Sequence, residues 1–266
     1  MKVLSNSREP TSLCDYAVSI DRIERPSREG EAEMSQDTFA YQGGELDVFA
    51  HAKAWKRYWQ ASIRRWVRGD VLEVGAGLGV NTAGLQSSDV RTWQCLEPDP
   101  TLAKKLAEQV CSLPRCSVST GTIANHTEHR YDTILYIDVL EHIEADRTEL
   151  AAAAELLRAA GRLIVLSPAH QFLYSEFDAA IGHFRRYDKA SLRACLPAGC
   201  ALTSMFYLDA AGMLVSLANR ALLRQSLPTV RQIQIWDRYI ISISRVLDPL
   251  LRHRLGKSIV AVWTRV

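Results

Sequence analysis

The chain has 266 residues, of which 47% are hydrophobic and 23% are charged, and its formal net charge is +2 at pH 7. This length fits one large domain better than two separate cores, and the composition is ordinary for a soluble globular protein. The nearly balanced charge creates no global field toward nucleic acid, so we predict no nucleic-acid partner.

Residues 1–36 are rich in Ser, Arg, Glu and Pro and hold few large apolar side chains. We predict a flexible leader there, followed by a single domain over residues 37–266. We see neither a secretory signal at the start nor an apolar run as long as a transmembrane segment. The sequence therefore favours a cytoplasmic protein.

An amphipathic helix is expected within residues 46–67. Trp55, Trp59, Ile63 and Trp66 recur there at helical spacing, and basic residues lie largely off that stripe. An aromatic face of this kind needs a partner. We assign the segment to a helical cap, together with residues 168–190 and 209–256.

Seven short apolar segments between residues 71 and 264 are expected to be strands. The first five alternate with helices, which predicts a doubly wound, mostly parallel α/β sheet with crossover helices on both faces. One of these helices is expected to begin with Asp146 as its cap and to continue through an alanine-rich stretch to Ala160. The expected strands are 71–74, 92–96, 116–119, 133–137, 163–166, 201–208 and 258–264.

Two helical stretches, about 210–223 and 229–254, separate the last two strands. The second carries an apolar side and a row of arginines that recur every seven residues. We favour a helix that covers the core or the substrate pocket with its arginines in solvent, because Asp237 and Asp248 interrupt the basic row. The alternative is a helix that lies on an anionic membrane surface. The arginines are Arg231, Arg238, Arg245 and Arg252.

The sequence contains six cysteines, and four of them form two pairs with a four-residue gap, Cys111/Cys116 and Cys195/Cys200. Zinc knuckles usually space their cysteines more closely, and these pairs have no histidine at ligand spacing. We therefore favour reduced thiols and predict no metal site.

The first expected strand runs into Gly75-Ala76-Gly77-Leu78-Gly79. Glycines allow a ligand to approach the backbone closely, and in an open parallel sheet this turn lies at the ligand-binding edge. Glu97 ends the next strand, where a carboxylate can accept both hydroxyls of a ribose. Together, the turn and Glu97 predict a ligand that contains adenosine.

Two details separate the possible ligands. The dinucleotide fingerprint requires a glycine where Val80 stands. Glu73, two residues before the first glycine, would crowd a pyrophosphate but suits a ligand with an ammonium group. Both details disfavour NAD.

The segments VLEVGAGLG (71–79) and YDTILYIDVLEHI (131–143), with Glu97 between them, resemble the class I S-adenosylmethionine methyltransferases, specifically the type 11 group. The resemblance implies a Rossmann-like fold whose third and sixth strands lie at opposite edges and whose last strand is antiparallel. It also implies S-adenosylmethionine as the cofactor. The family often has an acidic residue where Thr122 stands.

By this resemblance, the cofactor is held by residues at the ends of four strands. Those at its methionine end are Glu73, Gly75, Ala76, Gly77, Asp138 and Val139; those at the ribose are Glu97 and Pro98; those at the adenine are Gly121, Thr122 and Ile123.

The segment after the fifth strand contains a D-x-x-x-G-H-x-R-R-Y pattern, which also resembles this group. His183 could act as a base, and Arg185 and Arg186 suit an anionic acceptor. Alternatively, Asp178 pairs with one of the arginines to hold the segment in place and His183 only packs. His142 is a weaker candidate for the base.

We therefore predict an enzyme that transfers a methyl group from S-adenosylmethionine to a small molecule. Oxygen is the favoured acceptor atom, and sugar, lipid-linked and natural-product acceptors are the favoured classes. Two alternatives remain, an NAD-dependent oxidoreductase and a catalytically silent scaffold with the methyltransferase fold. The oligomeric state stays open.

Overall fold

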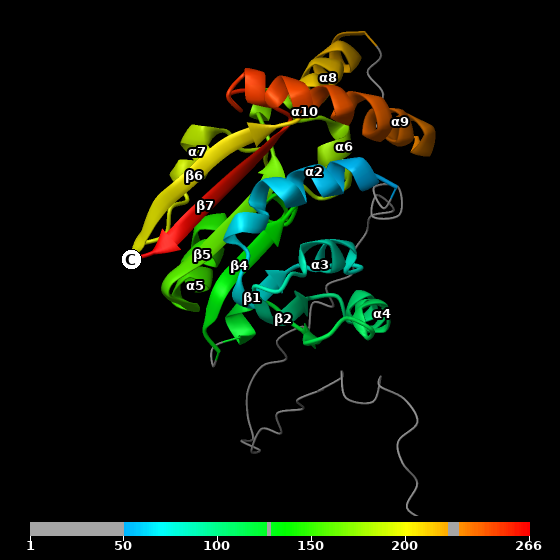
Figure 1. Ribbon diagram of the computed structural model, residues 1–266. Coiled ribbons are helices and arrows are strands. Elements are labelled where there is room, and N and C mark those ends of the chain that lie inside the picture. Colours follow the sequence, from blue (N-terminus) through cyan, green and yellow to red (C-terminus); the bar gives the residue numbers. More distant parts are fainter. Residues whose placement is uncertain (1–50, 127–128, 223–228) are drawn as a thin grey trace, which may run out of the picture.

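The computed structural model describes residues 51–126, 129–222 and 229–266 (Figure 1). Its strands are β1 (Gly69–Val74), β2 (Val90–Glu97), β3 (Cys116–Thr120), β4 (Tyr131–Ile137), β5 (Leu157–Pro168), β6 (Cys200–Leu208) and β7 (Ser258–Arg265). They form one sheet in the order β3-β2-β1-β4-β5-β7-β6. Every pairing is parallel except those of β7, which runs antiparallel to β5 and β6. The predicted doubly wound α/β fold is confirmed, with the third and sixth strands at opposite edges.

Helices cover both faces of this sheet. On one face, Trp59 and Leu106 join a hydrophobic cluster with the strands, and on the other face Leu150 and Leu192 do so. The helices are α2 (Lys53–Ile63), α3 (Val80–Leu85), α4 (Pro100–Val110), α5 (Asp146–Glu155), α6 (Glu176–Ala180), α7 (Lys189–Arg193), α8 (Ala210–Leu222), α9 (Val230–Ile235) and α10 (Ile241–Leu250), with a π-helical turn at Trp236–Ile240 between the last two.

The expected helix from Asp146 to Ala160 is shorter in the structure. It ends at Glu155, and β5 begins at Leu157, which pairs with Tyr131 of β4. Asp146 is the first helical residue rather than the cap, because its carboxylate accepts a hydrogen bond from Tyr187 and pairs with Arg185. Alanine favours helix locally, but pairing with β4 overrides that preference.

Helices α8, α9 and α10 lie together at the top of Figure 1, and α2 runs below them toward the middle of the molecule. Two buried carboxylates join them. Asp237 accepts hydrogen bonds from the amides of Ala54 and Trp55 at the start of α2. Asp248 accepts hydrogen bonds from the amides of Asp209 and Ala210 at the start of α8. We call these four helices the cap.

The predicted leader, residues 1–36, and the first residues of the expected cap segment 46–67 lie outside the described residues. Within the described ranges, each helix falls short of the length and hydropathy needed to cross a bilayer. The expected helix 229–254 is divided by the π-helical turn and ends at Leu250.

Candidate active site

The turn after β1 has three glycines in the left-handed region. The φ angles of Gly75, Gly77 and Gly79 are 66°, 56° and 71°, a conformation that glycine adopts without strain. A Cβ atom on Gly75 would meet the side chain of Val139 at 2.7 Å. Gly77, by contrast, borders open space, so a ligand could lie directly against its backbone.

Glu97, at the end of β2, is tied to this turn. Its Oε2 accepts a hydrogen bond of 2.8 Å from the Gly77 amide, and its Oε1 accepts one of 3.1 Å from the Asp99 amide. Burial raises the pKa of Glu97, and the two amides oppose that rise. Each carboxylate oxygen can accept a further hydrogen bond, which is the capacity that two ribose hydroxyls require.

Glu73 lies beneath the turn rather than on its surface. Its Oε2 accepts hydrogen bonds from the Thr82 hydroxyl at 2.6 Å and from the Trp93 indole at 3.0 Å. Burial raises the pKa of Glu73 to about 7. In this arrangement, Glu73 connects the turn to α3 and β2, and its expected role at the methionine end of the cofactor stays a prediction.

The expected adenine-binding residues follow β3. The amide of Gly121 donates a hydrogen bond to the carbonyl of Glu97, which places the end of β3 beside the end of β2. Thr122 is exposed, whereas Ile123 is buried and starts a short 3-10 helix. Pro98 is half-buried between Glu97 and Asp99, whose carboxylate caps α4.

Asp138 follows β4 and has a φ of 54°, an uncommon value for a residue with a side chain. Such strained positions concentrate at functional sites. Its side chain reaches solvent, yet surrounding protein raises its pKa to about 6 by desolvation, against the charges of His183, Lys56 and Lys257. Because β2, β1 and β4 are neighbours, Glu97, Gly77 and Asp138 lie along one edge of the sheet.

Comparison with known proteins identifies a domain that contains this edge of the sheet. A family model described as a methyltransferase domain matches residues 72–163, which include the turn, Glu97 and Asp138. Residues 72–163 therefore form a methyltransferase domain, and the fold is that of the class I S-adenosylmethionine-dependent methyltransferases. S-adenosylmethionine is accordingly its cofactor, and the open space at Gly77 beside the Glu97 carboxylate suits such a nucleoside.

Solved structures share the fold of this methyltransferase at low identity. One, from Galdieria sulphuraria and assigned as a sarcosine dimethylglycine methyltransferase, is 16% identical over 79% of this chain and 85% of its own, with a TM-score of 0.53. Coclaurine N-methyltransferase bound to N-methylheliamine and SAH is 13% identical over 79% and 72%, with a TM-score of 0.54. The mitomycin 7-O-methyltransferase is 13% identical over 84% and 55%, with a TM-score of 0.52. No curated protein sequence matches.

In the methyltransferase, His183 lies between two buried carboxyl groups. Its Nδ1 is 3.0 Å from Asp178 Oδ1, and its Nε2 is 3.9 Å from Glu141 Oε1. Asp178 also accepts hydrogen bonds from Arg186 and from Ser175. Burial favours protonation of Asp178, but these donors prevail and hold its pKa well below the usual range.

Both adjacent arginines make internal ion pairs. Arg186 binds Asp178, and Arg185 binds Asp146 at 2.7 Å and the carbonyl of Glu144 at 2.9 Å. This favours the interpretation in which the arginines hold the segment in place. They also line a cavity of about 380 Å³, which includes neither Gly77 nor Asp138. An acceptor anion at the arginines stays a prediction.

His142 and Glu141 belong to a 3-10 turn that directly follows β4. Glu141 is fully buried, accepts a hydrogen bond from Ser167, and has a pKa raised well above its usual range by burial. The ring of His142 meets that of His183 edge-on, with 4.5 Å between centroids. Burial lowers the pKa of His142 to about 4.

Three residues of this site were missed from the sequence, namely Glu141, Lys56 and Lys257. Burial lowers the pKa of both lysines, and the charge of Asp138 opposes the effect in each. A signal did exist for Glu141, since it is a charged residue directly after the apolar pair Val139–Leu140. The lysines lie far apart in sequence and carry no motif.

Proposed function

We propose that this methyltransferase methylates a hydroxyl oxygen of a small, lipid-linked acceptor. S-adenosylmethionine supplies the electrophilic methyl group, so the chain's own residues need to bind the cofactor, orient the acceptor and assist the loss of the acceptor's proton. The observation that carries the proposal is the approach of His183 Nε2 to Glu141 Oε1, 3.9 Å away in the turn just after Asp138, which brings the histidine cluster to the end of β4.

In this proposal, Gly77 and Glu97 hold the nucleoside, and Asp138 lies at its methionine end. Glu97 is already oriented by two backbone amides, so little side-chain freedom is lost when a ribose binds. Asp178 and Arg186 position His183. Their mutual ion pair supports one fixed orientation of the imidazole ring.

Oxygen is favoured over nitrogen because of the histidine cluster. A hydroxyl has a high pKa and needs to lose its proton as it attacks, whereas a neutral amine attacks with its own lone pair. The hydroxyl proton leaves at the His183 end of the site. The oxygen then forms a bond to the methyl carbon as the carbon–sulfur bond breaks.

The cap supports a lipid-linked acceptor. Its helices α9 and α10 bury one face, which includes Ile233, Ile241 and Ser244. Ten of the fifteen exposed large hydrophobic side chains in the described part of the chain fall between Leu214 and Leu255. On α9, the π-helical turn and α10, these form a second stripe at helical spacing, made by Ile235, Tyr239, Ile243, Val246 and Leu250. Large apolar patches of this kind mark interaction surfaces.

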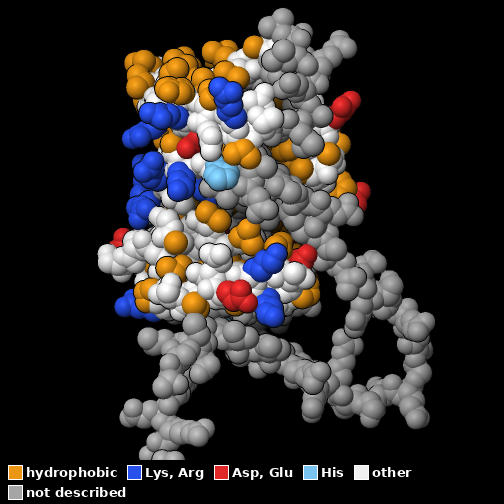
Figure 2. All heavy atoms as spheres, turned by 90° about the vertical axis from the view of Figure 1, so that its right-hand side faces the viewer, with side chains coloured by type: hydrophobic (Ala, Val, Ile, Leu, Met, Phe, Trp, Pro, Cys, Tyr) orange, Lys and Arg blue, Asp and Glu red, His pale blue; other side chains and the backbone are white. Residues whose placement is uncertain are grey.

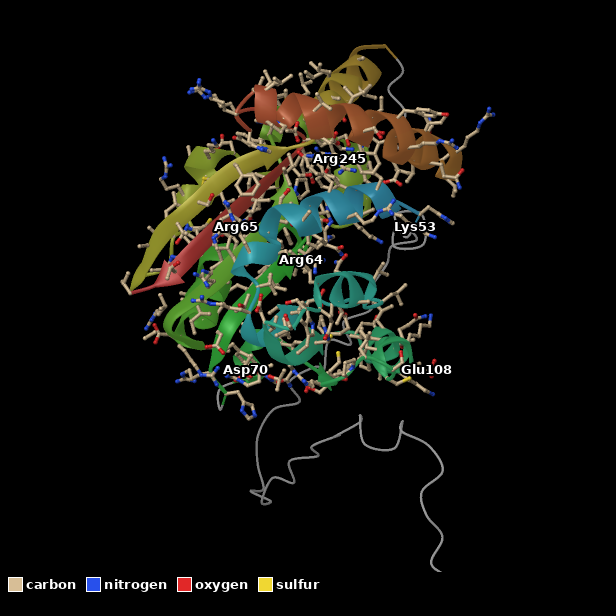
Figure 3. All side chains as sticks on the ribbon, viewed as in Figure 1. Lys53, Arg64, Arg65, Asp70, Glu108 and Arg245 are labelled. Atoms are coloured by element: carbon tan, nitrogen blue, oxygen red, sulfur yellow. The ribbon has the colours of Figure 1, made fainter. Side chains whose placement is uncertain are left out.

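Among the described residues of the same surface, the exposed charges are all positive. Asp209, Asp237 and Asp248 are buried and bound to the start of α2, the start of α8 or neighbouring polar side chains. Figure 2 shows hydrophobic and basic side chains gathered at this end of the molecule, and Figure 3 labels Arg245 beside α10, opposite Asp70. An apolar stripe flanked by cations suits an anionic bilayer surface. The exposed arginines are Arg231, Arg238, Arg245, Arg252 and Arg254.

Vesicle flotation tests the membrane part of the proposal. We expect binding to vesicles of phosphatidylcholine with 30% phosphatidylglycerol, and weak binding to phosphatidylcholine alone. Replacing Ile243, Val246 and Leu250 together by Ser should abolish it, because the apolar stripe is lost. Leu196→Ser, at an exposed apolar residue outside the cap, is the control. Equal flotation of the triple variant and the wild type would refute membrane binding through this surface.

Transfer from methyl-labelled cofactor to a total lipid extract tests the acceptor. We expect label in the organic phase as an alkali-stable ether. Label on nitrogen or carbon would overturn the oxygen assignment, and label only in water-soluble products would indicate a soluble sugar or natural product instead.

A further inference from the structure

Three side chains from two separate segments of the chain converge next to the acceptor end of the site. Glu141 and His142 come from the turn after β4, and His183 comes from the segment after α6. Each offers one ligand atom, and these atoms lie within 4.8 Å of one another. In the described part of the chain this is the one group of its kind.

A buried oxygen that has no hydrogen-bond partner within the described ranges faces His183 inside this group. Asp178 binds His183 through Nδ1 at 3.0 Å, so Nε2 is the ring nitrogen that is turned toward Glu141. Glu141 Oε1, 3.9 Å away, is buried and has no hydrogen-bond partner among the described residues. That distance is too long for a hydrogen bond.

A divalent cation would satisfy both atoms. Zinc binds imidazole nitrogen and carboxylate oxygen at about 2.0–2.2 Å, so a separation of 3.9 Å is close to the gap that one ion spans. His142 supplies the third ligand atom from the same turn as Glu141, and its ring meets that of His183 edge-on.

Each of the three side chains also has the outer partner that metal ligands usually have. Asp178 binds His183, Ser167 binds Glu141, and the backbone of Gly182 binds His142. Such partners fix the tautomer and direction of a ligand, and carboxylate–histidine–metal arrangements are common in zinc sites.

We propose that Glu141, His142 and His183 bind one zinc-like divalent cation. Three protein ligands leave a fourth position open, as in catalytic zinc sites. This role rests on the proposed function: the cation would bind the acceptor hydroxyl at the fourth position and raise its acidity. The hydroxyl proton would pass to solvent water, and the carbon–sulfur bond of the cofactor would break as the oxygen–carbon bond forms. The two cysteine pairs considered in the sequence play no part.

Metal content and Zn²⁺ binding test the site without any acceptor. Purified protein should contain about one zinc per chain, and the chelator-treated protein should bind Zn²⁺ in calorimetry. Glu141→Gln keeps the size and the Ser167 contact but should weaken Zn²⁺ binding by at least 10-fold. Asp178→Asn should weaken it by about 10- to 100-fold through the outer partner.

Two control variants address other metal-binding groups. His129→Asn removes an exposed histidine, and Cys116→Ser removes a thiol that lies 3.9 Å from Cys95. Neither should change the affinity. Binding of S-adenosylhomocysteine by Glu141→Gln at wild-type affinity shows that the variant is folded.

Wild-type protein without zinc and without Zn²⁺ binding overturns the proposal, as does Glu141→Gln that binds Zn²⁺ like the wild type. Methylation that persists after metal removal and is lost in His183→Asn overturns the catalytic role of the cation and assigns His183 as the base. Zinc bound at the site with label transferred to nitrogen leaves the metal site standing and overturns the proposed oxygen acceptor.

Discussion

The carboxylate of Glu97 accepts a hydrogen bond from the backbone amide of Gly77 across the boundary between two strands, with 2.8 Å between the two atoms. The contact couples the two parts of the cofactor site that lie at the ends of β1 and β2. It also means that a change at either residue alters the other, so their variants need matched controls.

Gly77→Val should lose the cofactor while keeping the fold. Gly77 has a φ of 56° and borders open space, so valine strains the backbone and fills the volume that the cofactor needs. We expect affinity for S-adenosylhomocysteine to fall by roughly 100-fold, equivalent to about 2.8 kcal/mol, in calorimetry. Gly199→Val carries a comparable strain at a φ of 69° far from the turn. Equal affinity loss in both variants would contradict a cofactor role for Gly77.

Glu97→Gln should lower the affinity for the cofactor by about 10-fold. The reason is that an amide NH₂ group replaces one of the two carboxylate oxygens offered to the ribose. The remaining amide oxygen can keep one of the two backbone contacts, so stability should change little. Glu155→Gln removes an exposed carboxylate that pairs with Arg265 and serves as the control. An unchanged dissociation constant for Glu97→Gln, measured by calorimetry, would place the ribose elsewhere.

Glu73 should make the protein less stable as the pH rises from 5 to 8. Its pKa is raised from 4.5 to about 7 in the folded state, so folding favours the protonated form. The stabilising contribution is therefore complete below the unfolded pKa and is lost as the pH passes through 7. At pH 8, Glu73→Gln should gain roughly 3 kcal/mol relative to wild type, since one pKa unit is worth about 1.4 kcal/mol.

Urea unfolding at pH 5 and pH 8 measures this effect. The difference between the two pH values should shrink in Glu73→Gln, and Glu108→Gln on α4 is the control. If both variants keep the wild-type difference, the carboxyl group of Glu73 is already ionised in the folded protein.

Much of the cofactor edge could be predicted from the sequence because its signals are local. The glycine turn follows directly from β1, Glu97 ends β2 and Asp138 follows β4, so periodicity and parallel pairing together place them on one edge. The same local reasoning failed between Asp146 and Ala160, where alanine content indicated a helix but pairing of Leu157 with Tyr131 extends β5.

The remaining features depend on contacts between distant segments. Asp237 and Asp248 seemed to break a basic surface, yet both are buried and bind helix starts on other segments. Because both carboxylates are buried, they add no negative charge to the surface, and the arginines that flank the exposed apolar stripe keep it basic. Likewise, nothing in the spacing of Glu141 and His183 indicates that their side chains meet.

Asp237→Ala should destabilise the protein by about 1–3 kcal/mol, because two amides at the start of α2, that of Trp55 buried and that of Ala54 partly buried, lose their acceptor. The exposed Asp89→Ala should have almost no effect. Thermal unfolding measures the stability, and limited proteolysis should show earlier cleavage in the α9–α10 region for Asp237→Ala. If its unfolding matches that of Asp89→Ala, the carboxylate does not hold α2.

The two adjacent arginines should behave differently when each is replaced by alanine. Arg186 is almost buried and pairs with fully buried Asp178, so Arg186→Ala removes the guanidinium that balances this buried charge, at a cost of about 3–5 kcal/mol. Arg185 is more exposed, and Arg185→Ala should cost less than about 1 kcal/mol. Urea unfolding of the single variants separates them. Only Arg185→Ala can then report on acceptor binding: loss of turnover with normal stability would support an anionic acceptor, and normal turnover would restrict both arginines to a structural role.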